Sequence, residues 1–345
     1  MPIKESKPIY EGQSKRFTRF RVFEILNDYT NENNHLKHTE IQDKLSTLYD
    51  IHIERKNIRE CIDDINYLGK PYGIYVNSEK GDGAFLLSRM FEKSEIAFLI
   101  DAIFSSRSID SKQAQELTRK LQRFLNKEDR KSFHYISKSG EMTRTDNELI
   151  FYNLDIILDA IEKGKKIKFK YNRYYLDALK NEKMKNRILV ASPYYLVNNQ
   201  GRYYLVCNNN YFNDIANYRI ERMTDVEILD EDIKPIKNLD GCEKGFDISK
   251  YTNENIYMFS NKAIINAKIK IDDEYTISYV QDWFGENAKI YQDKHDNKIY
   301  ADIHGNEQAI IYWCLQYGES IELLEPVSTR EKIKTIVDNM EKKYI

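Results

Sequence analysis

Arginine, lysine and asparagine side chains gather at the beginning of the segment 53–69, IERKNIRECIDDINYLG. The apolar residues Ile58, Cys61, Ile62, Ile65 and Leu68 recur at helical spacing on one face of a helix that begins near Glu54, and Ile58, Ile62 and Ile65 are expected to face inward. The polar side chains on or near the outer face are Arg55, Lys56, Asn57 and Arg59. Such side chains at the start of an exposed helix can read base edges in the major groove of DNA.

The alternative for this helix is a solvated face held by two ion pairs, Lys56–Glu60 and Arg59–Asp63. Each pair has the base before the acid, the weaker orientation, which is worth less than about 0.5 kcal/mol. Upstream, the run SKRFTRFR is basic and contains no acid, which is typical of an arm that contacts phosphates. Its candidate contacts are Lys15, Arg16 and Arg19.

Residues 14–88 have the pattern of three helices and a β-hairpin. The first helix is expected from Ser14 to Asn27, and Thr39 is expected to begin the second. The apolar stripe predicted for the first helix is Phe17, Phe20, Phe23 and Leu26. The stretches GIYV and AFLL would form the hairpin. This is the order of a winged helix-turn-helix, so residues 1–89 are assigned to a DNA-binding domain of that type.

A second concentration of positive charge lies between Glu162 and Arg187, where ten residues are basic and three are acidic. The lysines within 180–185 are interpreted as a solvated loop. Arg187, Arg219 and Arg222 differ because they lie in or beside tyrosine-rich strands. Arginines framed by tyrosines suit phosphates and stacked bases. For each of these arginines a structural salt bridge remains the alternative.

The rest of the chain predicts an α+β multidomain protein. Residues 90–146 are expected to be a helical connector that could form a dimer layer. In 147–231 a helix precedes several short strands, which suggests a small β-barrel. Residues 232–260 are interpreted as a linker. In 261–345 the order of strands and helices is βαββαβ, the ferredoxin-like pattern.

The search for catalytic and metal-binding motifs is negative. The sequence has no GxSxG, HExxH, GxxxxGK[ST] or GxGxxG pattern. His35 and His38 are three residues apart but have no nearby cysteine, so a surface loop is preferred to a metal site. Cys314 lies in an apolar helix and is interpreted as a core residue. We therefore expect no catalytic residue, no metal, no cofactor and no enzymatic activity.

Composition sets the broad class of the protein. The 345 residues are 41% hydrophobic and 31% charged with a net charge of −2, so global disorder is excluded and only local patches can indicate nucleic-acid binding. No apolar run approaches the ~18 residues of a membrane span, and the N-terminal stretch has no signal-peptide core. The four cysteines show no CxxC pair. They are interpreted as reduced thiols in a cytoplasmic protein.

Segment 147–231 resembles the WYL domain of bacterial transcriptional regulators. The matching stretches are a basic strand ending in Tyr171, then RILVASPYYLV, GRYYLVCNN and NYRIERM. Tyr203–Tyr204–Leu205 stands where the family has Trp-Tyr-Leu. IERKNIRECIDDINYLG is similar to the recognition helix of these regulators, although Glu54, Asn57 and Glu60 depart from its usual residues. YWCLQYGESIELLEPVSTREKI looks like their C-terminal (WCX-type) extension.

The resemblance implies a homodimeric regulator that binds double-stranded operator DNA, without a membrane partner. Its WYL domain, an Sm/SH3-like barrel, would sense a nucleic-acid or nucleotide effector through a positively charged pocket. The residues that the resemblance assigns to effector binding are Arg187, Tyr194, Tyr204, Arg219 and Arg222. The alternative is a WYL-containing accessory protein that binds nucleic acid without regulating transcription.

Overall fold

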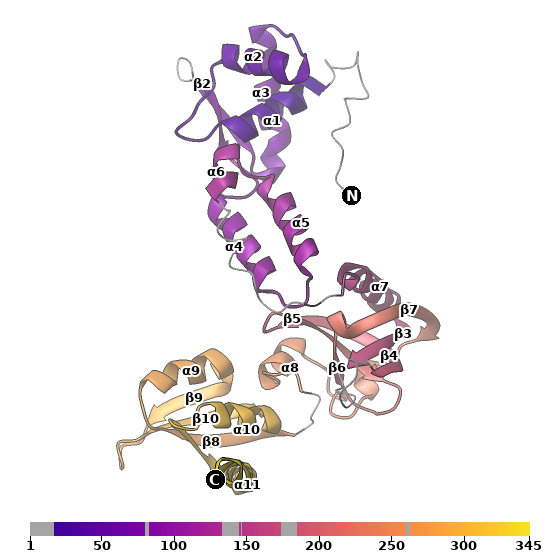
Figure 1. Cartoon of the computed structure of the whole chain (residues 1–345), viewed down its shortest axis with the longest axis vertical. Helices are drawn as coiled ribbons and strands as arrows, with labels where there is room; N and C mark the ends of the chain where they lie inside the picture. Colours follow the sequence, from indigo (N-terminus) through magenta and orange to yellow (C-terminus); the bar gives the residue numbers. More distant parts are fainter. Residues whose placement is uncertain (1–16, 80–82, 133–144, 146, 174–184, 260–262) are drawn as a thin grey trace. The chain divides into compact units, whose positions relative to one another are not determined.

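The structure is a computed structural model that describes residues 17–79, 83–132, 145, 147–173, 185–259 and 263–345. The chain divides into two compact units, residues 1–144 and 145–345, and each is considered separately (Figure 1). Helices and sheets both contribute, so the fold is of mixed α+β type. In the part of the chain that the structure describes, no helix combines the length and apolar character needed to cross a bilayer.

The first unit begins with three helices and a hairpin. The elements are α1 (Thr18–Tyr29), α2 (His38–Tyr49), α3 (Arg55–Gly69), β1 (Tyr75–Glu79) and β2 (Gly83–Ser88), and the two strands are antiparallel. Three further helices follow, α4 (Lys93–Ser105), α5 (Ser111–Gln122) and α6 (Lys127–Ser132). The side chain of Asp110 accepts hydrogen bonds from two amides at the start of α5, as its position before the helix predicts.

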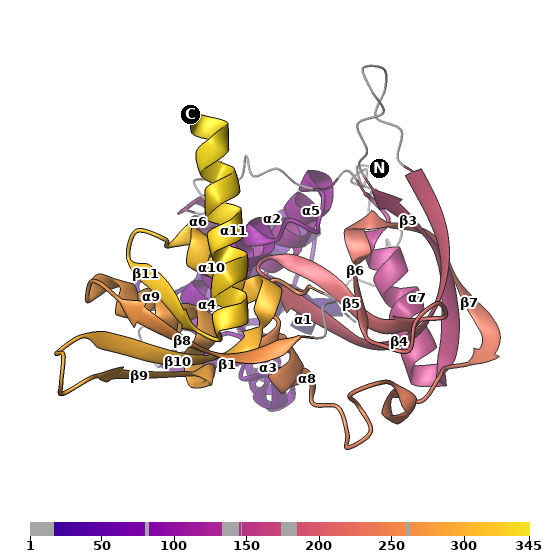
Figure 2. The same cartoon turned by 90° about the horizontal axis from the view of Figure 1, so that it is seen from below.

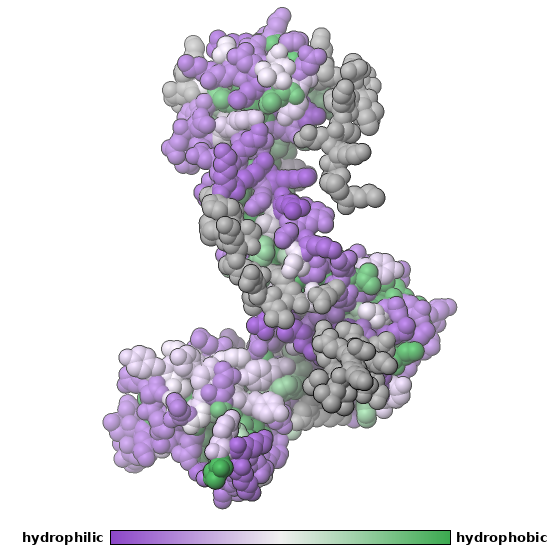
Figure 3. Space-filling model, viewed as in Figure 1, coloured by the Kyte–Doolittle hydropathy of each residue, from purple (hydrophilic) through white to green (hydrophobic). Residues whose placement is uncertain are grey.

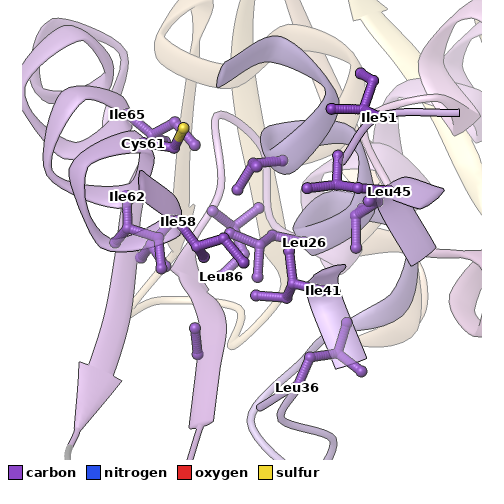
Figure 4. Close-up of a cluster of buried hydrophobic side chains, with 14 residues drawn as sticks. Leu26, Leu36, Ile41, Leu45, Ile51, Ile58, Cys61, Ile62, Ile65 and Leu86 are labelled. Atoms are coloured by element: carbon purple, nitrogen blue, oxygen red, sulfur yellow. The ribbon is translucent and has the colours of Figure 1, made fainter. Parts of the chain in front are cut away.

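One apolar core joins α1, α2, α3 and the hairpin (Figure 4). Its buried members include Leu26, Ile41, Leu45, Ile58, Cys61, Ile62, Ile65 and Leu86. The apolar face predicted for α3 is therefore confirmed for Ile58, Cys61, Ile62 and Ile65, but it is wrong for Leu68, which is 64% exposed. The stripe predicted for α1 is wrong in part, because Phe17 and Phe20 are 46% and 57% exposed. Leu26 is buried as predicted, and Val22 and Ile25 are buried in place of the two phenylalanines.

The second unit begins with helix α7 (Ile150–Lys163), which ends at Gly164 with a left-handed φ of 63°. Five strands follow, β3 (Lys165–Arg173), β4 (Lys185–Asn199), β5 (Arg202–Asn209), β6 (Ala216–Arg219) and β7 (Met223–Asp232). They form an antiparallel sheet in the order β6-β5-β4-β3-β7. The edge strands β6 and β7 are joined by only three residues, Ile220–Arg222, so the sheet curls until its edges approach each other.

Residues 232–260, expected to be a linker, contain helix α8 (Ile248–Glu254). Leu239 and Cys242 are buried against Tyr194 of β4. The remaining elements are β8 (Ile264–Ile271), α9 (Tyr275–Phe284), β9 (Ala288–Gln292), β10 (Ile299–Asn306), α10 (Glu307–Gln316), β11 (Ile321–Glu325) and α11 (Val327–Tyr344). The strands form an antiparallel sheet in the order β11-β8-β10-β9, and the predicted βαββαβ order of elements is confirmed.

A single core lies between this sheet and helices α9 and α10, with Trp313 fully buried at its centre. Both helices therefore cover the same face of the sheet. Helix α11 packs through its first turns only, since Thr329 is its one buried residue and the side chains after residue 336 are exposed (Figure 2).

Candidate functional site

The predicted DNA-reading side chains lie together on one exposed edge of α3. Arg55, Lys56, Asn57 and Arg59 are all exposed, while Ile58 between them is fully buried. Among the described residues, the structure shows no ion pair between Lys56 and Glu60 or between Arg59 and Asp63. The alternative of a face held by these two pairs is therefore not what the structure shows. The three cationic side chains remain available to an anionic partner.

The hairpin is fixed to α3 by one side chain. The amide nitrogen Nδ2 of Asn66 donates to the carbonyl oxygen of Val76 at 3.0 Å, and its oxygen Oδ1 accepts from the Val76 N–H at 2.7 Å. At the other end of the hairpin, Ala84 exchanges two backbone hydrogen bonds with Leu36. Gly83 has φ +92°, and a Cβ there would lie 2.8 Å from the Leu36 carbonyl oxygen. The hairpin beside the exposed edge of α3 is therefore closely packed against its neighbours.

His38 lies beside the cationic edge. Its Nε2 is 3.3 Å from the Ser78 hydroxyl of β1. Burial and then the positive charges of Arg55 and Arg59 lower the pKa of His38 below its usual 6.5. The two arginines are thus close enough to α2 and β1 to raise the local potential.

The basic arm before α1 is only partly within the described residues. Lys15 and Arg16 lie outside them. Arg19 forms an ion pair with Asp64 of α3, and both side chains are about half exposed. Arg19 is therefore paired within the molecule in this structure. Because an exposed ion pair contributes little free energy, Arg19 can leave Asp64 to contact a phosphate.

Within the described part of the basic stretch 162–187, the lysines of β3 are ion-paired. Lys165, Lys166, Lys168 and Lys170 of β3 each form an ion pair with a carboxylate of β7. The carboxylates are Asp230, Glu231, Glu227 and Asp225, together with Asp232, which also pairs with Lys165. The lysine-rich loop lies outside the described residues, apart from the backbone of Lys185. The lysines of β3 thus form cross-strand ion pairs with the carboxylates of β7.

A hollow with a different character lies over β4, β5 and β6. Its walls carry two arginines, two tyrosines and two asparagines, and Ala216 of β6 and the loop between β5 and β6 supply the rest. The lining residues are Tyr171, Arg187, Asn209, Phe212, Asp214, Ile215, Ala216, Asn217, Tyr218 and Arg222. Such a lining offers cationic, aromatic and hydrogen-bonding groups to one ligand.

The tyrosines of the hollow are held by ring and hydrogen-bond contacts. The rings of Tyr171 and Tyr218 meet edge to face at 4.9 Å, and both pack on Phe169. Asn209 Nδ2 donates to the Tyr218 hydroxyl at 3.1 Å. Burial raises the pKa of Tyr218, so this hydroxyl stays neutral near pH 7.

The two arginines of the hollow are not ion-paired within the described residues. The guanidinium of Arg187 lies 5.0 Å from the centre of the Tyr211 ring. The Nε of Arg222 is buried and has no hydrogen-bond partner among the described residues. A buried donor without a partner is uncommon in proteins, and an anionic oxygen in the hollow would satisfy it.

The region that contains the hollow is similar to a known protein family. The model of the WYL domain matches residues 152–228. The chain contains a WYL domain. The predicted resemblance is thereby confirmed for the segment that includes α7, the five-stranded sheet and the hollow.

The chain is also similar to known proteins beyond the WYL domain. It is 24% identical over 313 residues to the uncharacterized HTH-type transcriptional regulator YobV of Bacillus subtilis strain 168, which covers 87% of this chain and 92% of YobV. Among solved structures, it matches the proteasome accessory factor B/C (PafBC) of Arthrobacter aurescens with 14% identity and a TM-score of 0.29. That match covers 96% of this chain but only 51% of PafBC. A CRISPR Cas-related protein matches with 14% identity, a TM-score of 0.38 and coverage of 99% and 88%.

The WYL domain brings only two of the five predicted effector residues into the hollow, Arg187 and Arg222. Arg219 instead binds the buried carboxylate of Glu221, with Nε 2.6 Å from Oε1. Arg202 contacts the same oxygen at 3.2 Å. The salt-bridge alternative thus describes Arg219, whose side chain is 20% exposed, whereas that of Glu221 is 3% exposed.

The two predicted tyrosines also lie outside the hollow's lining. Tyr204 is the cross-strand neighbour of Arg219 on β5, and burial, followed by the charge of Glu221, raises its pKa. Tyr194 is buried on β4 and its hydroxyl donates to the carbonyl oxygen of Lys234 at 2.7 Å. Burial raises the pKa of Tyr194 to about 12. Both tyrosines therefore contribute to the packing of the WYL domain in this structure.

Eight of the ten lining residues of the hollow are absent from the predicted set, and the polar ones that can hydrogen-bond a ligand include Tyr171, Asn209, Asn217 and Tyr218. The alternation of β3 predicts an inward Tyr171, and Ala216–Arg219 pairs with β5 in a register that places Asn217 opposite Val206. The register between strands that are distant in the sequence decides which side chains line the hollow. The sequence of a single strand does not reveal that register.

The described residues offer no group of three or more histidine, cysteine, aspartate or glutamate side chains that could hold a metal ion. All four cysteines, Cys61, Cys207, Cys242 and Cys314, are buried, and none of them forms a disulfide within the described residues. Burial raises the pKa of the Cys207 thiol and brings that of Cys314 to about 12, so both remain protonated near neutral pH.

Proposed function

We propose that this chain is a DNA-binding transcriptional regulator whose WYL domain senses a nucleotide or nucleic-acid effector. The observation that carries the first part is the unpaired cationic edge of α3, formed by Arg55, Lys56 and Arg59 on a helix whose opposite face is buried. The likeness to YobV, named as an HTH-type transcriptional regulator, supports it. The hollow with Arg187 and Arg222 supports the second part.

In this proposal residues 1–89 form a winged helix-turn-helix in which α3 enters the major groove and β1–β2 is the wing. Residues 90–146 connect it to the WYL domain, 147–231, an Sm/SH3-like barrel, and 232–260 link that domain to a ferredoxin-like extension, 261–345. The sheet order β11-β8-β10-β9 supports the last assignment. The regulator acts as a homodimer, so its operator is an inverted repeat.

The DNA-binding role is tested with duplexes selected from random sequence by the full-length chain. Arg59→Ala is expected to weaken specific binding by about 1–3 kcal/mol and to relax the preference at one base position. Arg119→Ala, an exposed arginine of α5 in the same unit, is the matched control and should bind as the parent does. Unchanged affinity and site preference in Arg59→Ala would remove this residue from the interface. If no duplex is selected and single strands still bind, the role is that of an accessory nucleic-acid-binding protein.

The effector role is tested by anisotropy of labelled single-stranded oligonucleotides and nucleotides. Arg222→Ala and Arg187→Ala are expected to lose effector affinity while duplex affinity is kept, because each removes a guanidinium from the hollow. Lys237→Ala, an exposed lysine outside the hollow, serves as the control. An effector that binds all three variants equally well would place its site elsewhere.

A further inference from the structure

Aromatic side chains cover the outer face of α9 and α10. Tyr275, Tyr279 and Trp283 follow one another at four-residue spacing on α9, so they lie on one face of that helix. Tyr275 is 85% exposed, Tyr279 44% and Tyr312 of α10 49%. The surface over these helices is correspondingly pale in Figure 3, between hydrophilic and hydrophobic. We call this surface the α9–α10 face.

Ring contacts join the two helices across this face. Trp283 of α9 lies 5.3 Å from Tyr257, which lies 5.7 Å from Phe259, and Phe259 meets Tyr312 of α10 edge to face at 5.7 Å. Tyr279 stacks on Tyr317 at 5.1 Å. Because the rings support one another, the face is a firm aromatic platform rather than a set of separate side chains.

The charge of this face has one sign. Residues 272–287 and 306–320 contain seven carboxylates and no lysine, arginine or histidine, in a chain with 53 lysines and arginines. Five of these carboxylates are exposed, and one of them, Asp272, pairs with Lys270 of β8. The other four are Glu274, Asp282, Glu286 and Glu319. Within residues 263–345, which the structure describes throughout, and in the other described segments, none of the four has an ion-pair partner. This contrasts with the carboxylates of β7, which pair with lysines.

We propose that the α9–α10 face binds an arginine- or lysine-rich segment of a partner protein. A guanidinium or ammonium group placed over Tyr275, Tyr279 or Trp283 gains cation–π attraction, and the flanking carboxylates supply the opposite charge. Nucleic acid does not fit this face, because its phosphates would be repelled by the four unpaired carboxylates. The proposal adds a protein partner to a regulator whose DNA and effector sites lie elsewhere, and it does not depend on either.

The chain provides its own optical probe for the test. Its two tryptophans are Trp283, which is partly exposed on the α9–α10 face, and Trp313, which is fully buried. A ligand on the face should therefore change the emission of Trp283. The titrant is a short synthetic peptide in which arginine alternates with glycine, and the same peptide with glutamate in place of arginine is the control. We expect saturable binding of the arginine peptide only, weakened strongly as salt shortens the Debye length from about 10 Å at 0.1 M to about 3 Å at 1 M.

Three variants of the full-length chain separate the face from the rest of the surface. Asp282→Lys places a like charge beside the peptide, and Tyr275→Ala removes the most exposed ring, so each should weaken binding by about three-fold or more. Tyr152→Ala, whose ring is 62% exposed on α7, should bind as the parent does. Circular dichroism confirms that each variant is folded.

The proposal is overturned if the arginine peptide leaves the emission unchanged, or if Asp282→Lys and Tyr275→Ala bind it as well as Tyr152→Ala does. It is also overturned if Asp282→Lys abolishes self-association of the chain in sedimentation, since the face would then serve a second copy. Competition by an oligonucleotide at the same emission signal would assign the face to nucleic acid and reject a basic protein segment.

Discussion

Replacing Arg219 with alanine is expected to destabilise the WYL domain without removing a ligand contact. The guanidinium of Arg219 holds the carboxylate of Glu221, which is almost fully buried at 3% exposure. A buried carboxylate that loses its cationic partner must carry its charge in a poorly solvated place. The main effect of Arg219→Ala should therefore be a lower free energy of unfolding of the WYL domain.

The size of the effect follows from what remains around Glu221. Breaking a buried ion pair by removing one partner costs about 3–5 kcal/mol. In Arg219→Ala, Arg202 still lies 3.2 Å from Glu221 Oε1, so part of the compensation is kept. We therefore expect a loss of about 2–3 kcal/mol, just below that range. Lys168→Ala breaks an ion pair whose side chains are 44% and 54% exposed, and it should cost less than about 1 kcal/mol.

Hydrogen exchange of the β5 and β6 amides measures this difference within the full-length chain, where global melting would combine several domains. Exchange through unfolding of the sheet should be about 30- to 140-fold faster in Arg219→Ala than in the parent. Lys168→Ala should remain within a few-fold of the parent. Equal exchange in the two variants, together with loss of effector binding in Arg219→Ala, would show that Arg219 contacts the effector and that the bracing argument is wrong.

Two further predictions concern the first unit. Gly83→Ala should cost about 1–3 kcal/mol of unfolding free energy, because φ is +92° and the new Cβ would lie 2.8 Å from the Leu36 carbonyl oxygen. Gly73→Ala, with φ +68° and nothing within 4 Å of the new Cβ, is the matched variant and should cost less, about 1 kcal/mol. Hydrogen exchange of the α1 and α3 amides compares the two variants within the full-length chain, and equal exchange rates would contradict the close approach. The pKa of His38 is lowered in the folded state, so the folded protein binds this proton less readily than the unfolded chain does. The contribution of His38 to the free energy of unfolding should therefore be at its full value above pH 6.5. It should fall as the pH decreases through the folded pKa. His38→Gln should remove that part of the slope, and an unchanged slope would assign the pH dependence to another group.

Local patterns in the sequence predict the elements well where one period dominates. The stripe of Ile58, Ile62 and Ile65 identifies α3 and its exposed edge, and the βαββαβ order appears in the structure as expected. On α1, two overlapping apolar stripes compete. Phe17 and Phe20 continue one, whereas Val22 and Ile25 belong to the stripe that the core buries. Periodicity alone does not decide which of the two stripes is buried, because that depends on where the apolar surfaces of α2 and α3 lie.

The candidate sites depend on contacts between distant segments, and here the sequence is less informative. In the sequence, the lysines of β3 indicate a basic patch. In the structure, β7 lies beside β3 and its carboxylates pair with these lysines. Arg219 and Arg222 are three residues apart in one run, yet one binds Glu221 and the other faces the hollow. The three residues Ile220–Arg222 form a 3-10 turn, which redirects Arg222 from the alternation of β6. A strand-based prediction treats both arginines alike.

The ion pairs between β3 and β7 also have a consequence for the order in which the protein is made. Lys165 and Lys166 precede their carboxylates by 65 residues, and Lys168 precedes Glu227 by 59. At about 5–20 residues per second, translation leaves the basic strand uncompensated for roughly 3–13 seconds. During that time the lysines of β3 have no β7 carboxylate to pair with, and the synthesis of β7 supplies these partners and the neighbouring edge strand together.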